Sequence, residues 1–130
     1  MNQFTLSRQE RLSSKKDIDL LFTEPLSLTK YPIRLVWREL PIYTEAESPV
    51  RAMFSVSKKK FAKAVDRNRA KRLMKESYRL IKPALFEMLP AKKSFHLALL
   101  YTGNELLDFV TIQKSLATAL ERWTKKCQQE

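Results

Sequence analysis

The stretch SVSKKKFAKAVDRNRAKR, residues 55–72, decides the fold, because an extended pattern changes within it to a helical one. Its first residues end a run, 50–57, in which apolar side chains alternate, the period of a β-strand. From Asp66 onward apolar residues recur at helical spacing, and we expect Asp66 to be the N-cap because its carboxylate suits the positive end of the helix dipole. The expected buried stripe of this helix comprises Ala70, Leu73, Met74, Ser77 and Ile81.

Upstream of this stretch, the sequence predicts a short helix and another strand. Ser14 followed by Asp17 is typical of a helix N-terminus. The inner face of that helix is expected to comprise Ile18, Leu21 and Phe22. Residues 32–38 alternate in the manner of a strand, and the acidic segment 40–49 is predicted to connect it to a neighbouring strand, 50–57.

Downstream, one strand and one helix complete the pattern. Pro83 is expected to end the regular helix or to begin a short extra turn through Met88. Residues 95–101 are apolar enough for a central strand, and residues 108–126 form an amphipathic helical pattern. The order helix, strands, helix, strand, helix predicts an α+β fold in which helices pack against one sheet, within a single domain over residues 1–130.

The composition excludes several classes of site. A single glycine, Gly103, cannot supply a Gly-rich phosphate loop, and one cysteine with one histidine, Cys127 and His96, cannot form a disulfide or a Cys/His metal cage. No protein-based nucleophilic set emerges from these residues. The sequence shows neither a membrane-spanning apolar run nor a signal peptide. We therefore expect a cytoplasmic protein with no membrane partner and no small-molecule substrate.

Positive charge is concentrated in one quarter of the chain. The whole sequence carries 25 basic and 14 acidic side chains, a formal net charge of +11. Residues 51–82 hold 12 of the basic side chains against only Asp66 and Glu76, whereas the remaining residues are almost neutral. Such a dense run favours nucleic-acid binding; a solvated face or an acidic protein partner are the alternatives.

The basic stretch also resembles a known family, the protein subunit of bacterial ribonuclease P. The family signature is Ser-Lys-Lys, then, after a short gap, Ala-Val-x-Arg-Asn-Arg-x-Lys-Arg, which residues 57–59 and 64–72 match. The resemblance covers most of the chain and includes Phe4, Leu6, Arg11 and Leu12 near the start and residues 116–123 near the end. The chain departs from the family at residues 60–63, which are one residue longer and lack glycine, and at residues 100–102, which lack basic side chains.

The resemblance implies both a fold and an activity. The implied fold is αβββαβα, with four strands, three helices and a left-handed βαβ crossover through the Arg-Asn-Arg helix. The implied activity is that of an endoribonuclease subunit that assists a catalytic RNA in removing the 5′ leader from precursor tRNA. Chemistry is expected on the RNA, with Mg²⁺ held mainly by RNA, no catalytic residue on the protein and no cofactor bound by the protein alone.

The resemblance also implies two groups of binding residues. Those expected to dock on the catalytic RNA are Arg67, Asn68, Arg69, Lys71, Arg72, Lys75 and Arg79. Those expected to line a cleft for the single-stranded leader are Phe22, Arg34, Val36, Lys58, Lys59, Lys60 and Phe61. Single strands are gripped by aromatic platforms in a positive groove, and the candidate platforms are Phe22, Phe61 and Trp37. Strand alternation favours core packing for Trp37.

Two other functions are compatible with the charge and size. A structural RNA-binding protein of ribosomal type would be equally basic, but it would not require the Arg-Asn-Arg run or a groove for single strands. A DNA-binding helix fits less well, because the Arg-Asn-Arg residues follow a strand rather than the short turn of a helix-turn-helix motif.

Overall fold

The structure, a computed structural model, describes residues 10–23, 26–41 and 48–129. These residues form three helices and four strands in the order αβββαβα, which confirms the predicted fold class. The elements are α1 Lys15–Leu21, β1 Leu26–Lys30, β2 Ile33–Glu39, β3 Val50–Val56, α2 Ala64–Met88, β4 Phe95–Tyr101 and α3 Phe109–Gln129. Phe4 and Leu6, part of the family resemblance, lie outside the described residues.

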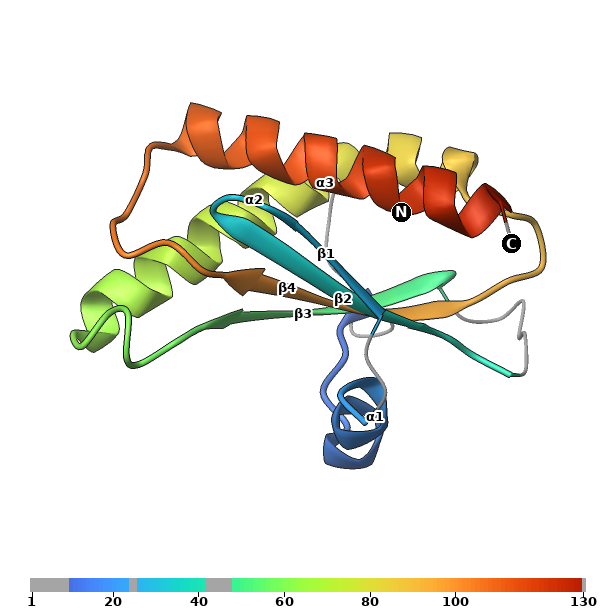
Figure 1. Ribbon diagram of the computed structural model, residues 1–130, viewed down its shortest axis with the longest axis horizontal. Coiled ribbons are helices and arrows are strands. Elements are labelled where there is room, and N and C mark those ends of the chain that lie inside the picture. The colour runs from blue at the N-terminus through green and yellow to red at the C-terminus, as the bar shows by residue number, and fades with distance from the viewer. Residues whose placement is uncertain (1–9, 24–25, 42–47, 130) are drawn as a thin grey trace.

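The four strands form one sheet with helices on both faces. Figure 1 shows α2 and α3 over one face and α1 alone on the other. The strand order is β1-β2-β4-β3; β3 and β4 are parallel and are joined through α2, and the other pairs are antiparallel. The chain therefore makes the βαβ crossover that the resemblance implied. The prediction that the strands on either side of residues 40–49 are neighbours was wrong, because β4 lies between them.

β4 takes the centre of the sheet because its side chains are buried on both faces. Six of its seven residues are buried, as expected of a central strand. By contrast β1, a strand that the sequence analysis did not predict, lies at an edge and is largely exposed, although its sequence LSLTK begins with alternating apolar and polar residues. Burial on both faces, not propensity, decides which strand is central.

Two apolar clusters hold the layers together. The larger cluster lies between the sheet and the helices α2 and α3. In it, the centroid of the Trp123 ring lies 6.4 Å from that of Trp37 and 5.4 Å from that of Phe95. Trp37 is 5% exposed, which confirms its prediction as core. The smaller cluster, between the sheet and α1, comprises Leu12, Leu21, Val36 and Ala98.

The boundaries of α2 differ from those predicted in two ways. The helix begins at Ala64 with Lys63 as the N-cap residue, so Asp66 lies in the first turn and is not the cap. The helix also continues through Pro83 to Met88, although proline removes one helical hydrogen bond. Leu85 beyond the proline is buried, and its burial offsets that cost.

The first helix begins as predicted but faces the sheet differently. Ser14 caps α1 by accepting a hydrogen bond from the Asp17 N–H at 3.4 Å. Leu21 is buried against the sheet as expected, whereas Phe22 is 40% exposed and does not belong to the inner face. The Leu12 N–H, just before this helix, donates to the Ala52 carbonyl at 2.9 Å and ties the chain to the free edge of β3.

Candidate RNA-binding surface

One side of α2 is buried and the other side presents a row of basic residues. Ala70, Met74, Ser77 and Tyr78 are buried against the sheet and α3, which fixes the rotation of the helix. The opposite side exposes Asn68, Arg69, Arg72 and Lys75, with Lys71 half-buried. This row, residues 68–75, is the basic stripe. Residues three or four apart share one helix face, so its cations can follow a single phosphate backbone.

Two of the other residues predicted to dock on the catalytic RNA already have partners within the chain. The Arg79 guanidinium pairs with the Glu76 carboxylate one helical turn away. The Arg67 guanidinium donates hydrogen bonds to the Phe61 and Ala62 carbonyls at 2.8 and 2.9 Å. The structure therefore separates these two arginines from the exposed basic stripe.

Three lysines occupy the turn between β3 and α2. Lys58, Lys59 and Lys60 are all exposed, as their predicted role requires. Ser57 orders the turn, since its hydroxyl accepts from the Lys59 N–H at 3.1 Å and its carbonyl accepts from the Lys60 N–H at 3.2 Å. The lysine turn, residues 57–63, thus places charge at the start of the basic stripe.

Two residues predicted to line the leader cleft are buried. Phe61 is 7% exposed, and its ring packs 5.7 Å from the Tyr101 ring, so it cannot serve as a stacking platform. Val36 is fully buried beneath α1, beside Leu21. These two predictions were wrong as direct contacts. Phe61 stands alone among lysines, and no periodicity in that segment indicated which way its side chain would point.

The remaining cleft candidates lie on the α1 side of the sheet. Phe22 is exposed, while Arg34 is half-buried on β2. Close by, a hollow of about 390 Å³ opens between the end of α1 and the first two strands; it is lined by Leu20, Thr23, Leu26, Trp37, Arg38 and Glu39. Leu20, Phe22 and Leu26 remain exposed although they are apolar. Arg38, which was not among the residues predicted for the cleft, also lines this hollow and alternates with Arg34 along β2.

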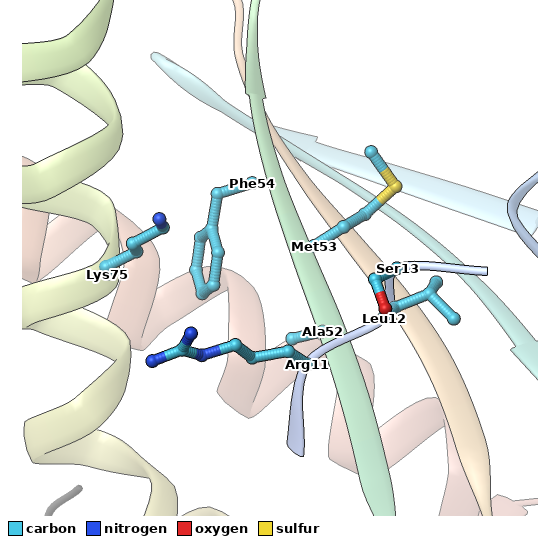
Figure 2. A pocket seen from close by; sticks show the side chains of 7 residues that line it. All are labelled: Arg11, Leu12, Ser13, Ala52, Met53, Phe54 and Lys75. Carbon is cyan, nitrogen blue, oxygen red and sulfur yellow. The ribbon is translucent and has the colours of Figure 1, made fainter. Parts of the chain in front are cut away.

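A second hollow, of about 370 Å³, lies between the start of the described chain, β3 and α2. Figure 2 shows Arg11, Phe54 and Lys75 gathered on the α2 side of β3, with Leu12 and Met53 on the other side. The Phe54 ring packs edge-on against Tyr78, with 5.6 Å between the ring centroids. Arg11 therefore lies near Lys75 of the basic stripe, although the two residues are 64 positions apart in the sequence.

The titratable groups with shifted pKa values do not point to a catalytic site. Burial raises the pKa of the Tyr78 phenol far above its usual range, and the Glu10 carboxylate raises it further. Hydrogen bonds from Thr111 lower the pKa of Asp108, which caps α3. Among the described residues, no group of three His, Cys, Asp or Glu side chains could hold a metal ion. None of the described helices is long and apolar enough to cross a membrane.

Comparison with known proteins assigns the family. The family model described as Ribonuclease P matches residues 6–124. The chain belongs to the ribonuclease P protein family. Among its relatives, the ribonuclease P protein component of Porphyromonas gingivalis is 37% identical over 120 residues, covering 92% of this chain and 86% of the relative. The corresponding protein of Chlorobaculum tepidum is 39% identical over 105 residues, covering 76% of this chain and 68% of the relative.

Solved structures of ribonuclease P proteins share the fold. The protein from Thermotoga maritima superposes with a TM-score of 0.66 at 27% identity, covering 87% of this chain and 96% of that one. The protein from Staphylococcus aureus gives a TM-score of 0.63 at 21% identity, covering 88% of this chain and 94% of that one. The motif that suggested the family, residues 57–72, forms the lysine turn and the first part of α2.

Proposed function

We propose that this chain is the RNA-binding subunit of ribonuclease P, which assists a catalytic RNA in removing the 5′ leader from precursor tRNA. The observation that carries the proposal is the exposed basic stripe of α2, placed directly after the lysine turn in a member of this family. Within that role the stripe binds the catalytic RNA, and Phe22, Arg34 and the lysine turn bind the leader.

Phosphate neutralisation is the physical contribution of the protein. Two RNA segments that approach each other repel, and cations fixed on a rigid helix reduce that repulsion without a large loss of side-chain freedom. Arg69 and Arg72 can grip phosphate oxygens with two parallel hydrogen bonds, whereas Lys75 acts as a point charge. The Mg²⁺ ions that the reaction uses are held mainly by RNA in this proposal, and the cleavage chemistry belongs to the RNA.

The direct test is cleavage of precursor tRNA at low Mg²⁺ by the matching catalytic RNA, with and without the protein. We expect the protein to restore correct 5′ cleavage and to cleave nothing alone. Binding to the RNA without any effect on cleavage would instead identify a structural RNA-binding protein of ribosomal type. A protein that cleaves precursor tRNA without the RNA would contradict the assignment of chemistry to the RNA.

Replacing Phe22 with alanine is expected to weaken binding of substrates that carry a leader by about 1–3 kcal/mol, the usual contribution of one stacked base. Phe22 is 40% exposed at the C-cap of α1, so the change removes the proposed platform without opening the core. The measurement is the affinity of the holoenzyme for precursor tRNA with and without its leader. An equal loss for both substrates would show that Phe22 does not contact the leader.

The matched control for Phe22 is Tyr31→Ala, since Tyr31 is also an exposed aromatic residue, 59% accessible, in the turn after β1. It is not among the residues proposed to bind RNA, so its replacement is expected to leave leader discrimination unchanged. If Tyr31→Ala lowered the affinity for leader-bearing substrate as much as Phe22→Ala does, the leader would contact exposed aromatic side chains in general and not the end of α1 in particular.

A further inference from the structure

We propose that Arg67, the first arginine of the Arg-Asn-Arg motif, is a positioning residue for the lysine turn and not a phosphate contact. The proposal deepens the function above and rests on it where RNA affinity is concerned. Arg67 is only half-exposed, whereas Arg69 and Arg72 of the same helix are exposed. One terminal nitrogen of Arg67, Nη1, donates to two main-chain carbonyls of the turn, those of Phe61 and Ala62.

No helical N–H group of the described residues bonds these two carbonyls. They precede the N-cap residue Lys63, so they lie outside the helical hydrogen-bond ladder. Lys63 also provides no side-chain cap for the helix. Bonds from a charged guanidinium at 2.8 and 2.9 Å are of the strong class and join the turn to the first turn of α2. Arg67 thereby links the turn to the helix through its carbonyls, which differs from an N-cap side chain that accepts from the helical N–H groups.

A buried aromatic contact between Phe61 and Tyr101 also fixes this turn. The buried Phe61 ring packs against Tyr101 at the end of β4. The Tyr101 hydroxyl donates to the Glu105 carbonyl at 2.7 Å and accepts from the Leu107 N–H at 3.0 Å. Arg67 therefore fastens the main chain of a turn whose one buried side chain is fixed in the core.

Holding the main chain at residues 61 and 62 restricts the backbone of the turn that carries the three lysines before RNA arrives. Ordering a flexible side chain costs free energy on binding, so a turn that is already ordered binds more tightly. The turn spans seven residues, 57–63, and a clamp on its main chain removes in advance conformations that binding would otherwise have to remove. Arg67 supplies that clamp from inside the chain.

The test compares Arg67→Ala and Arg67→Lys with Arg69→Ala in the full chain. Lysine keeps the charge, but its ammonium ends one bond short of Nη1 and is more strongly hydrated, so it restores the clamp poorly. The first measurement is amide hydrogen exchange of residues 57–63 in the free protein. We expect both Arg67 variants to exchange about tenfold faster there, and Arg69→Ala to match the unaltered chain.

The second measurement is the affinity for the catalytic RNA as a function of salt. A lost phosphate contact lowers the slope of log affinity against log salt by about 0.7–0.9, and we expect that change for Arg69→Ala alone. In the holoenzyme, both Arg67 variants should lose about threefold to tenfold in affinity for precursor tRNA with its leader, which the lysine turn is proposed to bind, while the salt slope for the catalytic RNA stays unchanged.

Either of two results would overturn the proposal. One is full affinity in Arg67→Lys together with a reduced slope in Arg67→Ala, the behaviour of a direct phosphate contact. The other is unchanged hydrogen exchange of residues 57–63 in Arg67→Ala. Failure of the unaltered chain to bind the catalytic RNA would refute the proposed function, whereas the exchange measurement still tests the clamp in the free protein.

Discussion

Replacing Arg69, Arg72 and Lys75 together with alanine is expected to reduce affinity for the catalytic RNA by about a hundredfold to five-hundredfold at about 0.1 M salt. All three side chains are exposed on the basic stripe. If each contacts one phosphate, the salt slope falls by about 2.1–2.7, and the loss in affinity should nearly vanish at about 1 M salt. The measurement is a binding titration of the RNA at four or more salt concentrations.

The matched control removes the same net charge from another helix. Lys114, Arg122 and Lys126 are exposed on α3. Replacing these three with alanine also lowers the net charge by three, so general attraction to RNA is reduced equally. We expect a much smaller loss of affinity than for the stripe variant. Equal losses for the two variants would show that the protein binds RNA by overall charge and that α2 has no special role.

Replacing Lys82 with alanine is expected to lower the free energy of unfolding by about 3–5 kcal/mol, the usual cost of removing one partner of a buried ion pair. The Lys82 ammonium lies 2.5 Å from the Glu10 carboxylate, and their side chains are 3% and 14% exposed. The pair joins the start of the described chain to α2 across 72 residues of sequence. Urea denaturation of the variant and the unaltered chain measures the effect.

An exposed ion pair provides the control for Lys82. Lys125 lies 3.5 Å from Glu121 on α3, with both side chains more than half exposed. Solvent screens such a pair, so Lys125→Ala is expected to change the free energy of unfolding by less than about 1 kcal/mol. A similar small loss for Lys82→Ala would mean that water reaches Glu10 and that the pair does not hold the chain start on α2.

Patterns of local sequence predicted most of the elements. The Ser14 cap, the alternation in residues 32–38 and the apolar run 95–101 each depend on neighbours within a few residues, and each was confirmed. The start of α2 was misplaced because Asp66 is a good cap by type. The N-cap residue is Lys63, which provides no side-chain cap, and the Arg67 guanidinium instead bonds the carbonyls five and six residues before it.

The candidate site was predicted in part for the same reason. Charge density and helical spacing are local, so the exposed lysines and the stripe around Arg69 were predicted to face solvent, and they do. Which aromatic side chain is exposed depends on the layer that covers it. Phe61 is buried against Tyr101, 40 residues away in the sequence, whereas Phe22 is exposed just beyond the end of α1.

The sequence by itself determined the basic run, the helical phase of α2 and the membership of the ribonuclease P protein family, because each depends on residues that lie close together in the chain. Tertiary structure alone decided the strand order, the burial of Lys82 against Glu10 and the inward turn of Arg67. Pairing across the sheet and burial of charge depend on contacts between distant segments, and the free energy of those contacts exceeds the local preferences that a sequence pattern records.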